Sequence, residues 1–338
     1  MANVFLRSPY FISVDAEGDG AESVKLIISV EGVEIYTVIK NKKDSSNYVM
    51  FEIAELLRDY LDIGYNSTLI ASDFSINASY VSESYSEVNG GGIIEATATV
   101  SFFGIDAYGY FEEGSNPTTT KGYMQSNTTI YKLGSDDIRI PIDRNNASAI
   151  AYYYEGVLVD SAVITSSATE AFIYLGEIND VDKVIITGTD GSVTLSVINI
   201  DECRFNPHKI SFVNRWGGIQ DLYFFKKSIE TLNAKRETYK NSTITNTGTY
   251  DSLIHARKDF NVQSTKEITL NSGYVSEDYN APMQELMQSE QVWMTVDNVI
   301  TPMNVKDSSF VFKTSLNDKM VDYKLQLTYA FDAINNIR

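Results

Sequence analysis

The stretch Phe205-Asn-Pro-His-Lys-Ile-Ser-Phe-Val-Asn-Arg-Trp-Gly-Gly-Ile-Gln-Asp-Leu-Tyr-Phe-Phe-Lys-Lys-Ser228 is the most informative part of this chain. Its alternation predicts two strands, Lys209–Val213 and Ile219–Phe225, that pair across the turn Asn214–Gly218. The two glycines of that turn permit the positive φ angles that tight hairpins need. The segment is rich in aromatic side chains and carries no nucleophile motif, so it predicts structure and no chemistry.

The rest of the composition favours strands as well. The chain has 338 residues, of which 43% are apolar and 12% are aromatic. This length is typical of two or three domains with sizeable cores. Because β-branched and aromatic residues fit a pleated surface, we predict a mainly β, multidomain protein with β-sandwich-like domains and a few short helices.

Three domains are expected. Residues 1–120 form a β-rich N-terminal domain with one short helix, for which the apolar spacing in 51–61 is the clearest candidate. Residues 121–205 hold about seven short strand patterns at roughly 8–12-residue spacing, which predicts a small β-sandwich. Residues 206–338 form a C-terminal β-rich assembly domain with a short helix near 276–289.

Local patterns refine this outline. Strands Val24–Val30 and Glu34–Ile39 are separated by a short turn, which predicts a hairpin. Residues 112–122 hold turn residues, a proline and no large apolar group, so they mark the first domain boundary. The charged stretch Lys226–Lys240 is either a short helix or a long edge strand.

Charge is unevenly placed along the chain. Residues 206–338 hold 15 Lys+Arg and 15 Asp+Glu, whereas residues 1–205 hold 12 and 30 and therefore carry the whole net charge of −18. The acidic part should repel nucleic acid and anionic membranes. No apolar run approaches the roughly 18 residues of a membrane span. We expect no nucleic-acid or membrane partner, and we expect the neutral part to pack against other proteins.

Metal and cofactor motifs are absent from the sequence. Cys203 is the single cysteine, so no intramolecular disulfide forms, and a lone cysteine is expected to be a small buried apolar residue. The two histidines, His208 and His255, have no zinc-ligand spacing. The acidic turn Asp15–Gly20 resembles the start of a calcium loop, but position twelve is Leu26 in place of glutamate. We therefore expect no metal, no cofactor and no catalytic residue.

The first ten residues contain no basic region followed by an apolar run, so a secretory signal is not expected. A β-rich protein that acts outside a cell without an export signal fits release by lysis, which points to a virion.

Two parts of the C-terminal domain resemble structural proteins of tailed bacteriophages of the tail, neck or baseplate type, and the resemblance covers about residues 205–332. It implies a virion component that acts through symmetric protein–protein assembly and not as an enzyme. It also implies a homo-oligomer, other virion proteins as partners, and localisation in the virion. The resemblance lies in the strand-turn-strand segment and in a later order of motifs: Ile210–Ser228, Leu270–Ser276, Met283–Met294, Pro302–Ser309 and Asp318–Ala330.

Aromatic side chains in this segment and near the N-terminus are candidate interface anchors, because interfaces are enriched in aromatic residues. The alternative is that they are core residues of their own domains. The candidates are Trp216, Tyr223, Phe224, Phe225, Tyr10 and Phe11.

Two other functions stay open. Exposed tyrosines such as Tyr80, Tyr85 and those at 152–154 could stack on sugars, which would make the chain a carbohydrate- or receptor-binding module of a tail fibre or adhesin with a host glycan as partner. A tail-associated glycan hydrolase would need two carboxylates about 5–10 Å apart in a cleft. No such pair can be named from the sequence.

Overall fold

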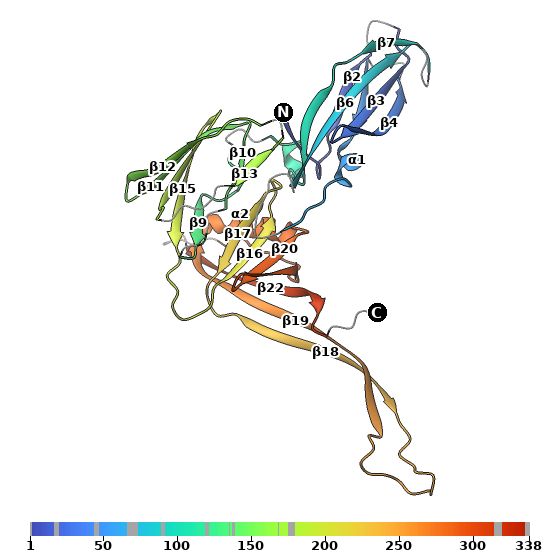
Figure 1. Ribbon diagram of the computed structural model, residues 1–338, viewed down its shortest axis with the longest axis vertical. Coiled ribbons are helices and arrows are strands. Elements are labelled where there is room, and N and C mark those ends of the chain that lie inside the picture. Colours follow the sequence, from blue (N-terminus) through green and yellow to red (C-terminus); the bar gives the residue numbers. More distant parts are fainter. Residues whose placement is uncertain are drawn as a thin grey trace. The chain divides into compact units, whose positions relative to one another are not determined.

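The protein is mainly β and multidomain, as the composition predicts (Figure 1). Strands account for most of the described residues, and the two α-helices among them are short. The computed structural model describes residues 2–16, 20–43, 47–65, 74–88, 92–118, 122–134, 136, 139–167, 169–174, 180–313 and 320–334.

The chain divides into two compact units, which we call unit 1 and unit 2. Unit 1 joins the first two predicted domains with two short segments from the C-terminal third. The domain boundary predicted near residue 120 lies outside the described residues, and the predicted boundaries stay predictions. Unit 1 comprises Met1–Asp201, Ser211–Leu222 and Asp278–Ser289, and unit 2 comprises Glu202–Ile210, Tyr223–Glu277 and Glu290–Arg338.

The first part of unit 1 is a sandwich of a six-stranded and a two-stranded sheet. The larger sheet has the order β1-β8-β6-β3-β4, with β7 paired to β6, and the smaller one pairs β2 with β5. Apolar residues of both sheets, including Leu26 and Phe51, share one buried cluster. The strands are β1 (Ala2–Phe5), β2 (Phe11–Asp15), β3 (Ser23–Val30), β4 (Val33–Asn41), β5 (Tyr48–Glu52), β6 (Ser75–Tyr85), β7 (Ile93–Ala96) and β8 (Val100–Ile105).

The hairpin predicted between residues 24 and 39 is confirmed. Strands β3 and β4 pair directly, and their two-residue turn consists of Glu31 at φ 50° and Gly32 at φ 78°. Two positive φ angles are the signature of the hairpin turn whose twist matches the strands.

The helix predicted over residues 51–61 is shorter, because helix α1 covers only Ala54–Arg58. Its first predicted residue, Phe51, belongs to β5. There Val49 and Phe51 are buried while Met50 is exposed, so a two-residue period holds this stretch in the sheet. The helical spacing of later apolar residues therefore starts three residues later than the sequence predicts.

The second part of unit 1 is also a two-sheet structure. Its five-stranded sheet has the order β12-β11-β14-β15-β9, and β10 pairs with β13. Ile142 of the small sheet and Val184 of the large one lie in one core cluster, as in a sandwich. The strands are β9 (Thr129–Lys132), β10 (Pro141–Asp143), β11 (Ala147–Tyr154), β12 (Val157–Val163), β13 (Phe172–Tyr174), β14 (Lys183–Gly188) and β15 (Gly191–Asn199).

The C-terminal third contributes one seven-stranded sheet in the order β17-β16-β20-β21-β22-β19-β18. The predicted strand-turn-strand is confirmed, since β16 and β17 are neighbours across the turn. Of the two structures expected for Lys226–Lys240, a short helix or a long edge strand, the chain forms the edge strand, which is β18. The strands are β16 (His208–Val213), β17 (Ile219–Phe224), β18 (Ile229–Lys240), β19 (Arg257–Ser276), β20 (Val292–Val296), β21 (Val299–Val305) and β22 (Met320–Asp332).

The helix predicted near residues 276–289 is confirmed as α2, Asn280–Gln288, which a single 3-10 turn at Glu277–Tyr279 precedes. Pro282 and Leu286 lie on its buried side. Within the described ranges, no helix has the length and apolar character that crossing a bilayer demands.

Candidate assembly surfaces

The turn between β16 and β17 is held by the side chain of Asn214, which is 1% exposed. Its Oδ1 accepts hydrogen bonds from the backbone N–H groups of Trp216 (3.0 Å) and Gly218 (3.2 Å). Its Nδ2 donates to the carbonyl of Met124 at 2.8 Å and to Oε1 of Gln220 at 3.2 Å. One buried amide thus shapes the turn and ties it to the second sandwich of unit 1.

The two glycines of this turn are required for different reasons. Gly217 has φ +79°, and its Cα faces the backbone of Asp106 closely enough that a Cβ would lie 3.3 Å from it. At Gly218, a Cβ would come within 2.6 Å of the Cβ of Pro141. The approach of Pro141 excludes a side chain at Gly218, whereas at Gly217 the positive φ and the tight contact with Asp106 together favour glycine.

The predicted anchor Trp216 is half-buried, and its ring is used inside unit 1. It contacts the ring of Phe5 edge-on at 5.7 Å between centroids. The Arg215 guanidinium lies 4.6 Å from the rings of both Trp216 and Tyr110, a cation–π arrangement. Arg215 also pairs with Glu113 at 2.5 Å. An interface role for Trp216 stays a prediction.

The three other candidates of this segment lie at the end of β17 and just beyond it. Tyr223 is 3% exposed and Phe224 is 0% exposed. Phe225 is half-buried, and its ring lies so close to Gly273 that a Cβ added there would be only 2.7 Å from the ring. Two of the three side chains are thus buried within the chain, and an interface role for all three stays a prediction.

Helix α2 carries a buried carboxylate into unit 1. Glu285 is 1% exposed and accepts hydrogen bonds from Ser126 Oγ and from the Arg215 backbone N–H, the latter at 3.3 Å. Burial raises the pKa of the Glu285 carboxyl, although these two hydrogen bonds and the Arg215 charge oppose the rise.

Replacing this carboxylate should change how stability depends on pH. A carboxyl with a raised pKa binds its proton more readily in the folded state, so the wild type loses stability as pH rises from the ordinary carboxyl pKa through the raised one. Glu285→Gln cannot titrate. Its melting temperature relative to wild type should therefore increase between pH 4 and pH 8, which calorimetry measures. The exposed Glu112→Gln is the matched control, and a Glu285→Gln difference that is flat or falls with pH contradicts the assignment.

The other two predicted anchors, Tyr10 and Phe11, line a surface hollow of about 660 Å³ in unit 1. Phe11 is 55% exposed, and Phe111, which also lines the hollow, is 99% exposed. Burial raises the pKa of Tyr10 and Tyr110, so both hydroxyls are neutral hydrogen-bonding groups at physiological pH. We call this the aromatic hollow; it is lined by Arg7, Ser8, Pro9, Tyr10, Phe11, Gly109, Tyr110, Phe111, Gly114, Ser115 and Asn116.

Asn116 holds the walls of the aromatic hollow together. Its Oδ1 accepts from the Phe5 backbone N–H at 3.0 Å, and its Nδ2 donates to the Phe5 carbonyl at 2.8 Å. Ser8 Oγ accepts from the Gly109 N–H at 2.7 Å. Because these bonds fix both segments, the exposed phenylalanines project from a rigid frame.

A second feature belongs to unit 2. The outer halves of β18 and β19 extend beyond the rest of their sheet as a two-stranded ribbon (Figure 1). We call residues 231–266 the hairpin arm. They hold 6 Lys+Arg and 3 Asp+Glu, a net charge of +3. Near its tip the apolar residues Ile244, Tyr250 and Leu253 are 71%, 81% and 88% exposed.

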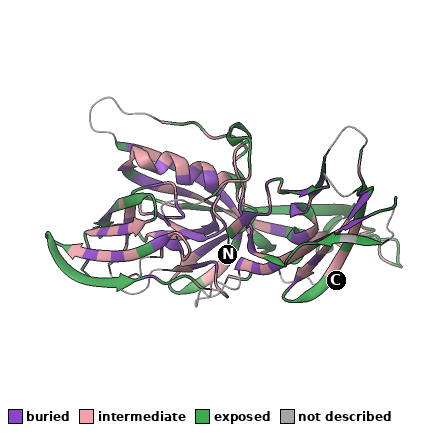
Figure 2. Cartoon of the chain, turned by 90° about the horizontal axis from the view of Figure 1, so that it is seen from above, coloured by how far each residue is buried: buried purple, intermediate pink, exposed green. Residues whose placement is uncertain are grey.

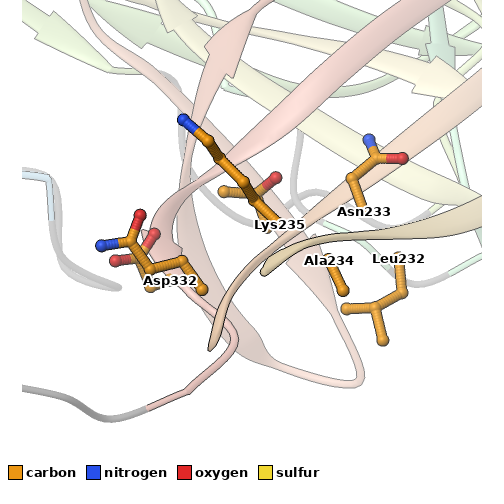
Figure 3. Close-up of a pocket in the computed structure, with 7 residues that line it drawn as sticks. Leu232, Asn233, Ala234, Lys235 and Asp332 are labelled. Atoms are coloured by element: carbon orange, nitrogen blue, oxygen red, sulfur yellow. The ribbon is translucent and has the colours of Figure 1, made fainter. Parts of the chain in front are cut away.

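At the base of the hairpin arm, β18 borders a hollow of about 500 Å³. Its walls come from β18, from β19 and from Asp332, which ends β22. Figure 3 shows Lys235 and Leu232 leaving β18 in different directions. Lys235 has no ion-pair partner among the residues that the structure describes.

A third, smaller hollow of about 200 Å³ in unit 1 contains the carboxylates Asp15 and Glu95 beside Tyr80. Both carboxylates are exposed. Among the described residues, no group of three or more histidine, cysteine or carboxylate side chains could hold a metal ion. Cys203 is exposed, in contrast to the expectation of burial, because it lies in the bend that follows β15.

Four of the six terminal strands in the three largest sheets are covered or protected. Asn116 hydrogen-bonds to the backbone of β1 at Phe5. At the start of β9, the Asp278 carboxylate accepts a hydrogen bond from the N–H of Thr129 at 2.9 Å. Strand β17 is buried, and the N–H of Ile219 donates to the Tyr174 hydroxyl. Strand β4 carries Lys40 near its end, a charge that discourages further pairing.

The other two terminal strands are open. All seven residues of β12 and all twelve of β18 are exposed, and Figure 2 shows such fully exposed stretches in green beside purple sheet centres. Within the described ranges, no other strand pairs with the outer edge of either strand, and on β12 the outward Ser161 N–H donates to Asp160 Oδ1 at 2.8 Å. The sequence does not reveal the openness of β12, because the apolar run Val157-Leu-Val159 predicts a buried strand.

Comparisons with known proteins add no family. No protein-family model and no curated protein matches the chain. Among solved structures, extracellular domains 3–5 of Drosophila OTK align over 80% of this chain and 90% of that one, with 8% identity and a TM-score of 0.20. That TM-score carries no argument about fold or function.

Proposed function

We propose that this chain is a structural component of a phage virion, in the tail, baseplate or neck, and that it acts by symmetric assembly with copies of itself and with other virion proteins. The observation that carries the proposal is the fully exposed edge strand β18 with its hairpin arm. An arm of this kind buries no core of its own, and proteins use such exposed edges to bind another chain.

Two further observations support the proposal. The net charge of −18 lies in residues 1–205, and the arm is basic, so different parts of two copies attract each other. The resemblance over residues 205–332 also points to tail-associated structural proteins. No catalytic step, cofactor or metal belongs to the proposal.

The direct test is the protein content of purified particles. Mass spectrometry of density-gradient-purified virions of the phage that encodes this sequence should find the chain at a fixed copy number relative to the other virion proteins. Infectious particles that lack the polypeptide would refute a structural role.

A second candidate function is binding of a host glycan by a tail fibre or adhesin, and the aromatic hollow favours it. Exposed rings on a rigid frame beside tyrosine hydroxyls are the elements of a sugar-stacking site. This alternative places the ligand at Phe11 and Phe111.

The glycan hypothesis has its own expected result. On a glycan array the purified chain should show saturable binding, and Phe11→Ser with Phe111→Ser should weaken it about thirtyfold, since stacking contributes on the order of 1 kcal/mol per ring. Phe331→Ser, at a 53% exposed position of unit 2, is the matched control. Equal binding by all three proteins would exclude the aromatic hollow as the glycan site.

A further inference from the structure

We propose that β12 of one copy pairs edge-to-edge with β18 of a second copy, so that neighbouring copies extend each other's sheets. This inference rests on the proposed function, because it names the contact through which copies assemble. Both strands present an outer row of backbone N–H and C=O groups that no described strand pairs with, although the Ser161 N–H of β12 donates to Asp160 Oδ1. Strand addition supplies partners for such rows.

The side chains of β12 favour a protein partner over solvent. Val157, Leu158, Val159 and Val163 are 67%, 52%, 51% and 82% exposed. Exposed edges of soluble proteins usually carry lysine or proline, and β12 carries neither. A strand added at this edge covers part of these apolar side chains with its own cross-strand neighbours.

Charge decides between pairing of β12 with itself and with β18. Asp160 is the central residue of the seven in β12, so an antiparallel pair of two β12 strands centred on it would set Asp160 opposite its copy. Like charges directly opposite each other destabilise a strand pair. Asp160 has no ion-pair partner in the part of the chain that is described.

Strand β18 offers the complementary charge. It carries Lys235, Arg236 and Lys240 against Glu230 and Glu237, a net charge of +1 on the strand, and the whole hairpin arm has a net charge of +3. Lys235 has no ion-pair partner among the described residues, and Arg236 pairs only across the hairpin with Asp259, at 3.7 Å. A β12–β18 contact therefore relieves two unpaired charges together.

The pairing has a consequence for symmetry. Because two different strands meet, the contact is heterologous: each copy offers its β12 to one neighbour and its β18 to another. Such contacts close into rings or continue as filaments, whereas a β12–β12 contact would stop at a dimer.

Cross-linking with single cysteines tests the contact. In a Cys203→Ser background, one chain carries Ala162→Cys on β12 and a differently tagged chain carries Ala234→Cys on β18, and the two are co-expressed. A short bis-maleimide should join the two tags in one covalent dimer, while either variant expressed alone gives no dimer. The proposal is overturned if no mixed dimer forms, or if Ala162→Cys alone gives as much covalent dimer as the two variants together.

Charge exchange supplies the second arm of the test. Asp160→Lys, and separately Lys235→Glu with Arg236→Glu, should each reduce the mixed dimer about fivefold, and combining the changes should restore it. The exposed Asp190→Lys of the same sandwich is the control and should leave the yield unchanged. Loss without restoration overturns the proposal.

Light scattering on the same samples without cross-linker separates this inference from the proposed function. A stable oligomer without the mixed dimer rejects the β12–β18 contact and leaves assembly standing. A lone chain in solution that is also missing from purified particles rejects both.

Discussion

Asn214→Ala should lower the free energy of unfolding of unit 1 by about 3–5 kcal/mol. The change leaves the backbone N–H groups of Trp216 and Gly218 and the carbonyl of Met124 without their partner in a buried site. Each unsatisfied buried group costs about 1–3 kcal/mol. For a unit of this size the loss corresponds to a melting temperature lower by about 8–15 °C.

The measurement can report on unit 1 alone. The chain has two tryptophans, Trp216 in unit 1 and Trp293 in unit 2. In a Trp293→Phe background, fluorescence during urea unfolding follows the turn at Trp216. Asn233→Ala, at an exposed position of β18, is the matched control and should change stability by less than about 0.5 kcal/mol. A loss below about 1 kcal/mol for Asn214→Ala would show that the turn does not organise unit 1.

Two lysines on the open edge of β12 should dissociate the oligomer while each chain stays folded. Val159→Lys with Val163→Lys places charges where the proposed partner strand would bury apolar side chains. The expected cost is about 2–3 kcal/mol of association free energy, which makes the dissociation constant roughly thirtyfold to hundredfold larger. Sedimentation velocity over a concentration series measures the shift.

The control for this pair uses the other exposed edge of unit 1. Val33→Lys with Ile39→Lys changes two apolar residues of β4 that are 64% and 43% exposed. Because β4 already carries Lys40, these changes should leave the association constant within about twofold of wild type. Equal dissociation by both variants would mean that general charge, and not the β12 edge, controls assembly.

Elements with strong local signals were predictable from the sequence. The hairpin at Glu31 and Gly32, the strand-turn-strand around Trp216 and helix α2 each have turn residues or apolar spacing that specify them locally. The N-terminal end of α1 was misplaced because Phe51 satisfies both a helical and an alternating pattern, and pairing with β2 favours the strand.

The surfaces were less predictable, because they depend on which strand ends a sheet. An apolar run such as Val157–Val159 predicts burial, and only the strand order places it at an edge. The environment of Glu285 depends on Ser126 and Arg215, which lie 159 and 70 residues away in the sequence. The exposure of Phe111 was not predictable, because a single phenylalanine in a turn has no sequence pattern that separates an exposed ring from a buried one.

Light scattering after size-exclusion chromatography of the purified full chain tests the central claim, which is assembly through open strand edges, most directly. We expect a single species whose mass is a fixed multiple of the chain mass, and the chain mass alone for the β12 lysine variant. A wild-type protein that runs at the mass of one chain at every concentration would contradict the account.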